Sequence, residues 1–181
     1  MTVPNLITTI RIILTPIFII YLLDGQFLSG LFVFMICVLS DGLDGTLARV
    51  FNQKSKLGSY LDPLADKMLL ISAFIVLAVL GFLPSWLTVL AISRDILIML
   101  GIFILYLNGL KISIKPSILS KITTCLQFAA VIVVLSKDFL LSYLPFFPYL
   151  FYMAGFFTII SGLQYMHYWF RIIGEGGSTE N

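Results

Sequence analysis

Long apolar segments recur along almost the whole chain, and short polar segments separate them. A helix needs about 20 apolar residues to cross a bilayer, where its backbone must satisfy its own hydrogen bonds. Of the 181 residues, 60% are hydrophobic and only 11% are charged, which leaves room for about six such helices joined by short loops. We therefore expect an all-α integral membrane protein, a bundle of about six transmembrane helices with a short N-terminal interfacial segment over residues 1–10.

Turn-forming residues and the apolar pattern set the expected helix boundaries. Pro63 is tolerated in the first turn of a helix but disrupts its interior, so the ordered part of the third helix is expected to start close to Asp62. Tight turns are expected at Asp24-Gly25-Gln26 and over residues 81–85. The helices are expected over residues 12–23, 28–49, 58–80, 86–107, 118–135 and 149–170. We expect one membrane domain over residues 1–173, and residues 174–181 are predicted to form a disordered tail.

Acidic residues gather in one part of the chain, at the ends of the second and third expected helices. Four of the nine lie there: Asp41, Asp44, Asp62 and Asp66. The members of each pair are three or four residues apart and therefore share a helical face. Four carboxylates next to hydrocarbon repel one another unless they are protonated or hold cations. Without a nearby His or Cys they favour hard ions such as Mg²⁺, Mn²⁺ or Ca²⁺, and we expect a site for two divalent cations.

Small and cationic residues accompany these carboxylates. Gly45 and Ala48 lie on the same helical face as Asp41 and leave a groove beside it, because no large side chain stands there. Arg49 offers a planar fork of donors that suits a phosphate or a diphosphate. This arrangement predicts a site for a nucleotide diphosphate.

Eight positions of this stretch are similar to the signature of the CDP-alcohol phosphotransferases, integral membrane enzymes of phospholipid synthesis: Asp41, Asp44, Gly45, Ala48, Arg49, Gly58, Asp62 and Asp66. The resemblance implies that the four aspartates bind two divalent cations, Mg²⁺ or Mn²⁺, and that Asp66 is also the general base. It implies that the CDP moiety is bound by Gly45, Ala48, Arg49 and Gly58. Asn5 and Arg11 would support the site from the N-terminal segment. The resemblance also suggests a homodimer.

The implied reaction is transfer of a phosphatidyl group from CDP-diacylglycerol to an alcohol, with release of CMP. The resemblance is closest to the branch that makes phosphatidylglycerol phosphate and cardiolipin. Candidates for binding the phosphate of the acceptor or of the lipid are Arg94, Lys121 and Arg11.

The identity of the acceptor depends on the cations available to bind it. Arg94 and Asp95 lie inside an apolar segment, where either a functional role or a structural ion pair explains them. Dianionic glycerol-3-phosphate calls for a cluster of basic residues. The resemblance implies that enzymes using it carry a second Arg about a turn and a half after the position of Arg94 and a Lys-x-Lys-Thr pattern on the fifth helix. In this chain the first position is apolar, around Gly101 and Ile102, and the second reads Lys121-Ile122-Thr123-Thr124. We therefore favour phosphatidylglycerol, which makes the protein a cardiolipin synthase, with glycerol-3-phosphate as the alternative.

Other classes of protein also place acidic residues in membrane helices. A cation transporter usually carries them near the bilayer midplane on broken helices, whereas here they lie at helix ends beside a basic loop. A prenyl-chain enzyme also pairs aspartates with Mg²⁺, but it leaves the Gly, Ala and Arg positions unexplained. The acidic residues can also be simple markers of the membrane boundary or helix caps, although a boundary requires no such spacing.

Loop cations predict the orientation in the membrane. With six spans, one side of the membrane holds both termini and the second and fourth loops, and it receives most of the basic residues: Arg49, Lys54, Lys56, Lys111, Lys115, Lys121 and Arg171. The opposite side has Lys137 as its loop cation. Because basic loops stay on the cytoplasmic side, we expect the site to face the cytoplasm, in the inner membrane of a bacterium.

Overall fold

The computed structural model describes residues 3–51, 58–107, 117–137 and 147–176, and the side chains of residues 10–40, 67–104, 117–137 and 148–171. Within these residues the chain is helical apart from short turns. The helices are α1 (Val3–Leu23), α2 (Phe27–Phe51), α3 (Gly58–Val79), α4 (Ser85–Leu107), α5 (Ile118–Leu135) and α7 (Phe147–Gly176). They form two compact units, the first of residues 1–83 and 131–144 and the second of residues 84–130 and 145–181.

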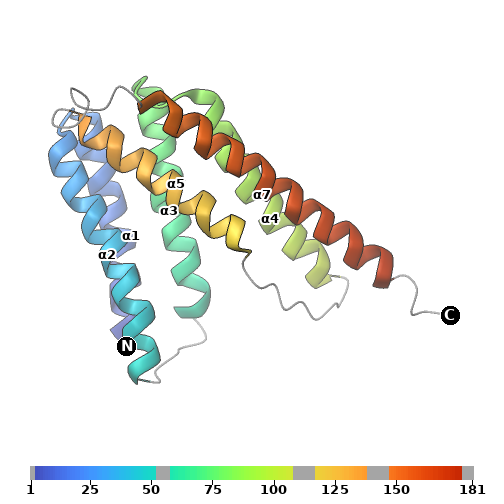
Figure 1. Ribbon diagram of the computed structural model, residues 1–181. Helices are drawn as coiled ribbons and strands as arrows, with labels where there is room; N and C mark the ends of the chain where they lie inside the picture. The colour runs from blue at the N-terminus through green and yellow to red at the C-terminus, as the bar shows by residue number, and fades with distance from the viewer. Residues whose placement is uncertain (1–2, 52–57, 108–116, 138–146, 177–181) are drawn as a thin grey trace. The chain divides into compact units, whose positions relative to one another are not determined.

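In the first unit, α1 packs against both α2 and α3 (Figure 1). Large apolar side chains are fully buried where the helices meet, among them Phe18, Leu22, Phe34 and Leu77. The rings of Phe18 and Phe34 lie 5.5 Å apart, centroid to centroid. Between membrane helices such contacts act mainly through van der Waals packing, because lipid is as apolar as these side chains.

Two glycines end helices of the first unit in the same way. Gly25 follows α1 with a φ of 72°, and Gly81 follows α3 with a φ of 76°, a left-handed conformation that residues with a Cβ rarely adopt. The next amide in each case closes the helix, because Gln26 N–H donates to the Tyr21 carbonyl (2.8 Å) and Phe82 N–H donates to the Leu77 carbonyl (2.9 Å). Both turns were expected from the sequence.

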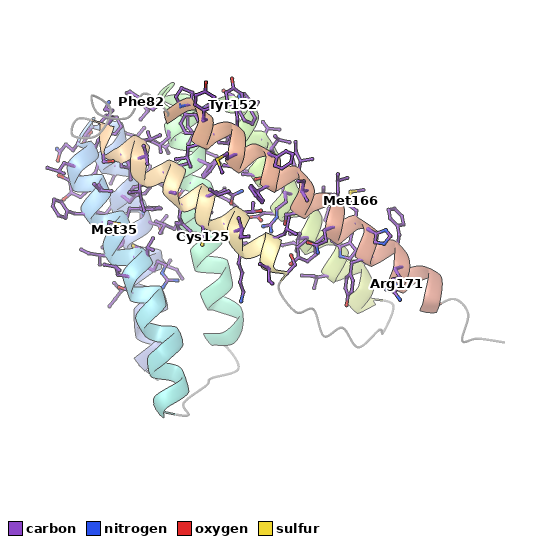
Figure 2. The ribbon with its side chains drawn as sticks, in the orientation of Figure 1. Met35, Phe82, Cys125, Tyr152, Met166 and Arg171 are labelled. Carbon is purple, nitrogen blue, oxygen red and sulfur yellow. The ribbon has the colours of Figure 1, made fainter. Side chains whose placement is uncertain are left out.

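In the second unit, α4 and α7 run parallel and side by side (Figure 1). Each helix has a glycine against which a tryptophan of the other helix lies. A Cβ at Gly101 would stand 2.0 Å from the ring of Trp169, and a Cβ at Gly155 would stand 2.5 Å from the ring of Trp86. The Trp86 ring also stacks on Tyr152, labelled in Figure 2, at 5.7 Å between centroids. The two glycines therefore allow the indole rings to pack close to the facing backbone.

Helix α5 begins with a side-chain cap. The Ser117 hydroxyl oxygen accepts a hydrogen bond from the Ser120 amide at 3.1 Å, which satisfies one of the amides that have no partner inside the helix. Buried hydrogen bonds then join α5 to α7. Thr123 donates to the Phe157 carbonyl (3.0 Å), and Gln127 donates to Thr158 (3.2 Å).

Several described helices have the length or the surface of membrane helices. In the described part of the chain, Ser85–Ile104 and Ile118–Leu135 are long and apolar enough to cross a bilayer, and the apolar stretches Ile10–Leu23, Phe27–Ser40 and Lys67–Val79 are shorter. Apolar side chains that are more than half exposed include Phe32, Val79, Val89, Ile118 and Phe170. Such apolar surface is typical of contact with lipid or with another protein. The helical class is confirmed for the described residues, and six membrane crossings stay a prediction.

Three helix boundaries differ from those expected. α1 starts at Val3, so residues 3–10 are not a separate interfacial turn; Pro4 fits because prolines are tolerated in a first turn. α3 starts at Gly58, as its expected range has it, but its ordered part does not begin only near Asp62, since Pro63 removes only one backbone N–H from the helix. α7 continues to Gly176, so the first three residues of the predicted tail are helical.

Candidate functional site

The two acidic pairs lie on consecutive helices of the first unit. α2 carries Asp41, Asp44, Gly45, Ala48 and Arg49, and α3 carries Gly58, Asp62 and Asp66. The end of α2, the start of α3 and the start of α1 lie at the same end of this unit (Figure 1). Only residues 52–57 separate α2 from α3, so the two helix ends are within about 25 Å of each other even if that segment is fully extended.

Three predicted site residues lie at similar distances from this end of the unit. At a rise of 1.5 Å per residue, Arg11, Asp41 and Asp66 each lie about 12–15 Å from the near end of their helix. Asp44 and Asp62 lie closer to that end. Because α1 contacts both α2 and α3, the three helices can contribute to one site at this end of the unit.

The side chains of Asn5 and of residues 41–66 lie outside the described ones. The contacts predicted for the four aspartates and for the CDP-binding positions therefore stay predictions. Among the residues whose side chains are described, no group of three or more His, Cys, Asp or Glu could hold a metal ion.

Arg11 is the one predicted site residue of the first unit whose side chain is described. It is 2% exposed and is among the largest fully buried side chains of the described residues. Its carbonyl accepts a hydrogen bond from the Thr15 hydroxyl at 2.9 Å, one turn later in α1. A buried guanidinium is costly unless anionic or polar groups compensate its charge. Arg11 is therefore a cation held inside a helix unit that also carries the acidic pairs.

Arg94 lies in the second unit, at the centre of a buried polar cluster. The cluster comprises Arg94 and Asp95 of α4, Ser120 of α5, and Ser161 and Tyr165 of α7. Arg94 and Asp95 are 6% and 7% exposed, and Arg94 Nη1 donates to Asp95 Oδ1 at 2.7 Å. The ion pair, which was one of the two interpretations of these residues, is therefore present.

The remaining contacts of Arg94 tie three helices together. Arg94 Nη2 donates to the hydroxyl oxygens of both Ser120 and Ser161, the latter at 3.0 Å. The guanidinium carbon lies 5.9 Å from the centre of the Tyr165 ring, within range of a cation–π interaction. The guanidinium is thus fixed from α4, α5 and α7 at once.

Lys121 lies next to this cluster in the sequence, because it follows Ser120 directly. Its side chain is exposed, and its amide donates to the Ser117 carbonyl at 3.2 Å in the first turn of α5. Arg94 therefore contacts the helical turn that also carries Lys121, and a shared phosphate site of the two residues stays a prediction.

The sequence did not assign a role to Ser120, Ser161 or Tyr165. Ser161 and Tyr165 lie one helical turn apart on α7, and all three are polar or amphipathic residues in otherwise apolar segments. These polar side chains in apolar segments were the sequence signal that could have pointed to a role for the three residues. Their partner could not be identified, since the contacts join positions far apart in the chain.

Comparison with known proteins adds a family assignment. The family model of the CDP-alcohol phosphatidyltransferases matches residues 1–169. The chain is 35% identical to a CDP-diacylglycerol–glycerol-3-phosphate 3-phosphatidyltransferase of Bacillus subtilis over 90% of this chain and 92% of that protein. It is 32% identical to a probable CMP-forming cardiolipin synthase of Drosophila melanogaster over 96% of this chain.

A CMP-forming cardiolipin synthase of Rattus norvegicus is 34% identical over 92% of the chain. The chain spans about 60% of the length of these two cardiolipin synthases. The matched region includes the first helix unit, most of the second and all eight positions of the motif. This chain therefore belongs to the CDP-alcohol phosphatidyltransferase family of enzymes.

Proposed function

We propose that this protein transfers a phosphatidyl group from CDP-diacylglycerol to an alcohol, with release of CMP, in the synthesis of anionic phospholipids. The observation that carries the proposal is the family match over residues 1–169, together with the complete eight-residue motif inside it. The common end of α1, α2 and α3 (Figure 1) gives further support, because it allows the two acidic pairs to serve one site.

The membrane setting follows from the same proposal. We propose one membrane domain whose helices cross the bilayer, with both termini and the motif on the cytoplasmic side of a bacterial inner membrane. The basic segments beside the motif support this orientation. A lipid donor and a lipid acceptor can then keep their acyl chains among the helices while their head groups reach the site. We also expect a homodimer, as the family resemblance suggests.

The motif aspartates fit a pair of hard divalent cations. Asp41, Asp44, Asp62 and Asp66 supply only carboxylate oxygens, the donors that Mg²⁺ and Mn²⁺ prefer, and the carboxylates need such charge compensation beside apolar helices. When bound, the cations would reduce the negative charge of the diphosphate and stabilise the departing phosphate of CMP.

The residues of the chain have distinct tasks in the transfer. Arg49 binds the diphosphate, while Gly45, Ala48 and Gly58 leave space for the CDP moiety. Asp66 accepts the proton of the acceptor hydroxyl as its oxygen bonds to the phosphorus next to diacylglycerol. The bond from that phosphorus to the CMP oxygen breaks, and CMP leaves with the bonding electrons.

We favour phosphatidylglycerol as the acceptor, and glycerol-3-phosphate is the alternative. The named relatives include both kinds of enzyme. Two features of the second unit favour the less charged acceptor. The charge of Arg94 is already paired with Asp95. The Trp169 ring fills the space beside Gly101, so that position offers no second cation for a dianionic acceptor.

An acceptor panel tests the proposal. The purified protein, in vesicles that contain CDP-diacylglycerol and Mg²⁺, is given phosphatidylglycerol, glycerol-3-phosphate or free glycerol, and the products are resolved by mass spectrometry. We expect CMP and cardiolipin with phosphatidylglycerol. Phosphatidylglycerol phosphate as the main product would establish the alternative acceptor, and no CMP with any acceptor would overturn the proposed function.

A further inference from the structure

The buried cation of α1, Arg11, needs a counter-charge inside its own helix unit. Its side chain is 2% exposed, so almost none of it is open to water or to a lipid head group outside the unit. A buried charge is stable only where charged or polar groups compensate it. The helices that pack against α1 in this unit are α2 and α3, and the compensating group is to be sought on them.

Two described contacts fix how α1 and α2 are aligned. The helices run antiparallel on either side of the turn at Gly25 (Figure 1). A Cβ at Gly30 would stand 3.0 Å from Leu22 Cδ2, and the rings of Phe18 and Phe34 lie 5.5 Å apart. From the first contact to the second, each helix advances by four residues away from the turn. The alignment of the two helices is therefore constant along this stretch.

The same alignment, continued by seven residues on each helix, places Arg11 opposite position 41. Seven residues make nearly two full turns, so this step returns to the same helical face about 10 Å further along. It leads from Phe18 to Arg11 on α1 and from Phe34 to Asp41 on α2. α1 continues through Pro16 as one helix, and α2 is unbroken over these positions. The alignment therefore predicts that Asp41 faces Arg11.

Depth along the helices makes other acids of the first unit less suitable partners. Asp24 is exposed in the turn that follows α1, about 20 Å along the helix axis from Arg11. The outer member of each motif pair lies at least about one turn beyond the level of Arg11. Asp66 is at a similar depth, but it belongs to α3, and the proposed mechanism needs it to accept the proton of the acceptor. Asp41 is the acid that matches Arg11 in both depth and face.

We propose that Arg11 pairs with Asp41 across the contact of α1 with α2 and orients this carboxylate for a divalent cation. The inference rests on the proposed function, in which Asp41 is a metal ligand. A carboxylate has two oxygens, so one can bind a cation while the other accepts hydrogen bonds from a guanidinium. Partners of this kind fix the direction of a metal ligand. Arg11 is then a positioning residue, and it does not bind the phosphate of the acceptor or of the lipid.

The first experiment measures the coupling of the two residues without metal or turnover. Thermal midpoints of the purified protein in EDTA are compared for Arg11→Met, Asp41→Asn and the double variant. Each single variant leaves the other charge buried and uncompensated, so we expect its midpoint to fall by at least about 6 °C. The double variant should be more stable than Arg11→Met alone.

The matched control repeats this cycle with Asp44→Asn in place of Asp41→Asn. Asp44 belongs to the same motif pair but lies about one turn further from Arg11, so we expect at most about half of the coupling. Additive effects of Arg11→Met and Asp41→Asn would contradict the pairing. An equally strong coupling of Arg11 with Asp44 would also contradict it.

Kinetics distinguish a residue that orients a metal ligand from one that binds a phosphate. Arg11→Met should raise the Mg²⁺ concentration for half-maximal CMP release by about tenfold or more, while KM for phosphatidylglycerol stays near the wild-type value. Arg11→Lys keeps the cation and should recover part of the loss. A higher KM with an unchanged Mg²⁺ requirement would identify Arg11 as a phosphate-binding residue and overturn the inference.

A disulfide cross-link tests the facing positions directly and does not depend on the stability of the single variants. With Cys37 and Cys125 replaced by Ala, Arg11→Cys is combined with Asp41→Cys, so that both charges are removed together. The control combines Ile13→Cys, whose position on α1 is 58% exposed, with Asp41→Cys and Arg11→Met. Oxidation should join the first pair of cysteines and not the second, because a disulfide needs close Cβ atoms. Equal cross-linking in both proteins, or none in either, would contradict the predicted alignment.

The design separates the pairing from the proposed function. The thermal cycle and the cross-link need no turnover, so they test the pairing even in a protein without activity. A wild-type protein that releases no CMP with any acceptor contradicts the proposed function. An active wild-type protein in which the effects of Arg11→Met and Asp41→Asn are additive contradicts only the role of Arg11.

Discussion

At the scale of single residues, Gly101 and Gly155 are required by the aromatic rings that lie against them. Each faces a Trp side chain of the opposite helix at a distance too short for a Cβ. Gly162 belongs to the same α4 and α7 interface, but a Cβ there would make an ordinary van der Waals contact. The three glycines therefore differ in what a methyl group would meet.

Gly101→Ala should destabilise the protein, because the added methyl group displaces the Trp169 ring. Overpacking of this kind costs about 1–3 kcal/mol. Gly162→Ala is the matched control, and it should leave stability unchanged or raise it by up to about 1 kcal/mol through helix propensity. Thermal unfolding in detergent measures both. Equal midpoints for the two variants would contradict the described packing of α4 against α7.

Asp66→Asn should abolish CMP release while the protein still inserts and folds. Loss of a general base lowers the rate by at least about 10²-fold, and loss of a metal ligand adds to this effect. Asp24→Asn is the control, because Asp24 lies in the turn between α1 and α2, outside the motif. Turnover of Asp66→Asn at the wild-type rate would remove Asp66 from the base role.

Residue types alone identified the motif and offered the Arg94–Asp95 ion pair as one of two interpretations of these residues. A carboxylate and a guanidinium that are adjacent in an apolar helix must find compensation, and the nearest group is each other. The contacts of Ser120 and Ser161 with Arg94 could not be predicted, because they depend on the register between helices. That register is set by packing, including the contacts of two Trp side chains with two glycines, which no local pattern specifies.

At the scale of helices, the end of α5 is held by an aromatic cage. Lys137 Nζ lies 3.6 Å from the ring centres of both Phe27 and Phe82; Phe82 is labelled in Figure 2. The two rings meet edge to face at 4.9 Å between centroids. The cage joins the residues after α5 to the start of α2 and to the turn after α3.

Lys137→Met should therefore lower the stability of the protein by about 1–2 kcal/mol, because it removes a cation from between two rings. Lys137→Arg keeps the cation and should retain most of the wild-type stability. The thermal midpoint in detergent compares the three proteins. If Lys137→Met is as stable as the wild type, the cage does not hold α5.

Helix boundaries could be predicted where local chemistry determines them. The turns at Gly25 and Gly81 and the bounds of α5 agree with the sequence pattern, because glycine and a serine cap act within a few residues. The start of α1 was placed too late. The range of the third helix was expected from residue 58, but its ordered part was expected to start only close to Asp62. There Pro63 was taken as a limit, although the lost hydrogen bond of one proline near a helix start does not end the helix.

At the scale of the whole molecule, the orientation in the membrane can be tested by labelling. With Cys37 and Cys125 replaced by Ala, a single cysteine is introduced by Ser55→Cys or by Ser142→Cys. The basic segment around Ser55 is predicted to be cytoplasmic, and the aromatic segment around Ser142 is predicted to lie on the other side. A membrane-impermeant thiol reagent should label Ser55→Cys in inverted inner-membrane vesicles. It should label Ser142→Cys in spheroplasts. Labelling of both from one side would contradict the six-span topology.

The central claim is that the two aspartate pairs of α2 and α3 hold divalent cations that CMP release requires. The most direct test measures CMP release from CDP-diacylglycerol and phosphatidylglycerol by the purified protein after treatment with EDTA. We predict no release until Mg²⁺ or Mn²⁺ is restored, and no recovery by either ion in Asp44→Asn. Full release of CMP in excess EDTA would contradict the claim.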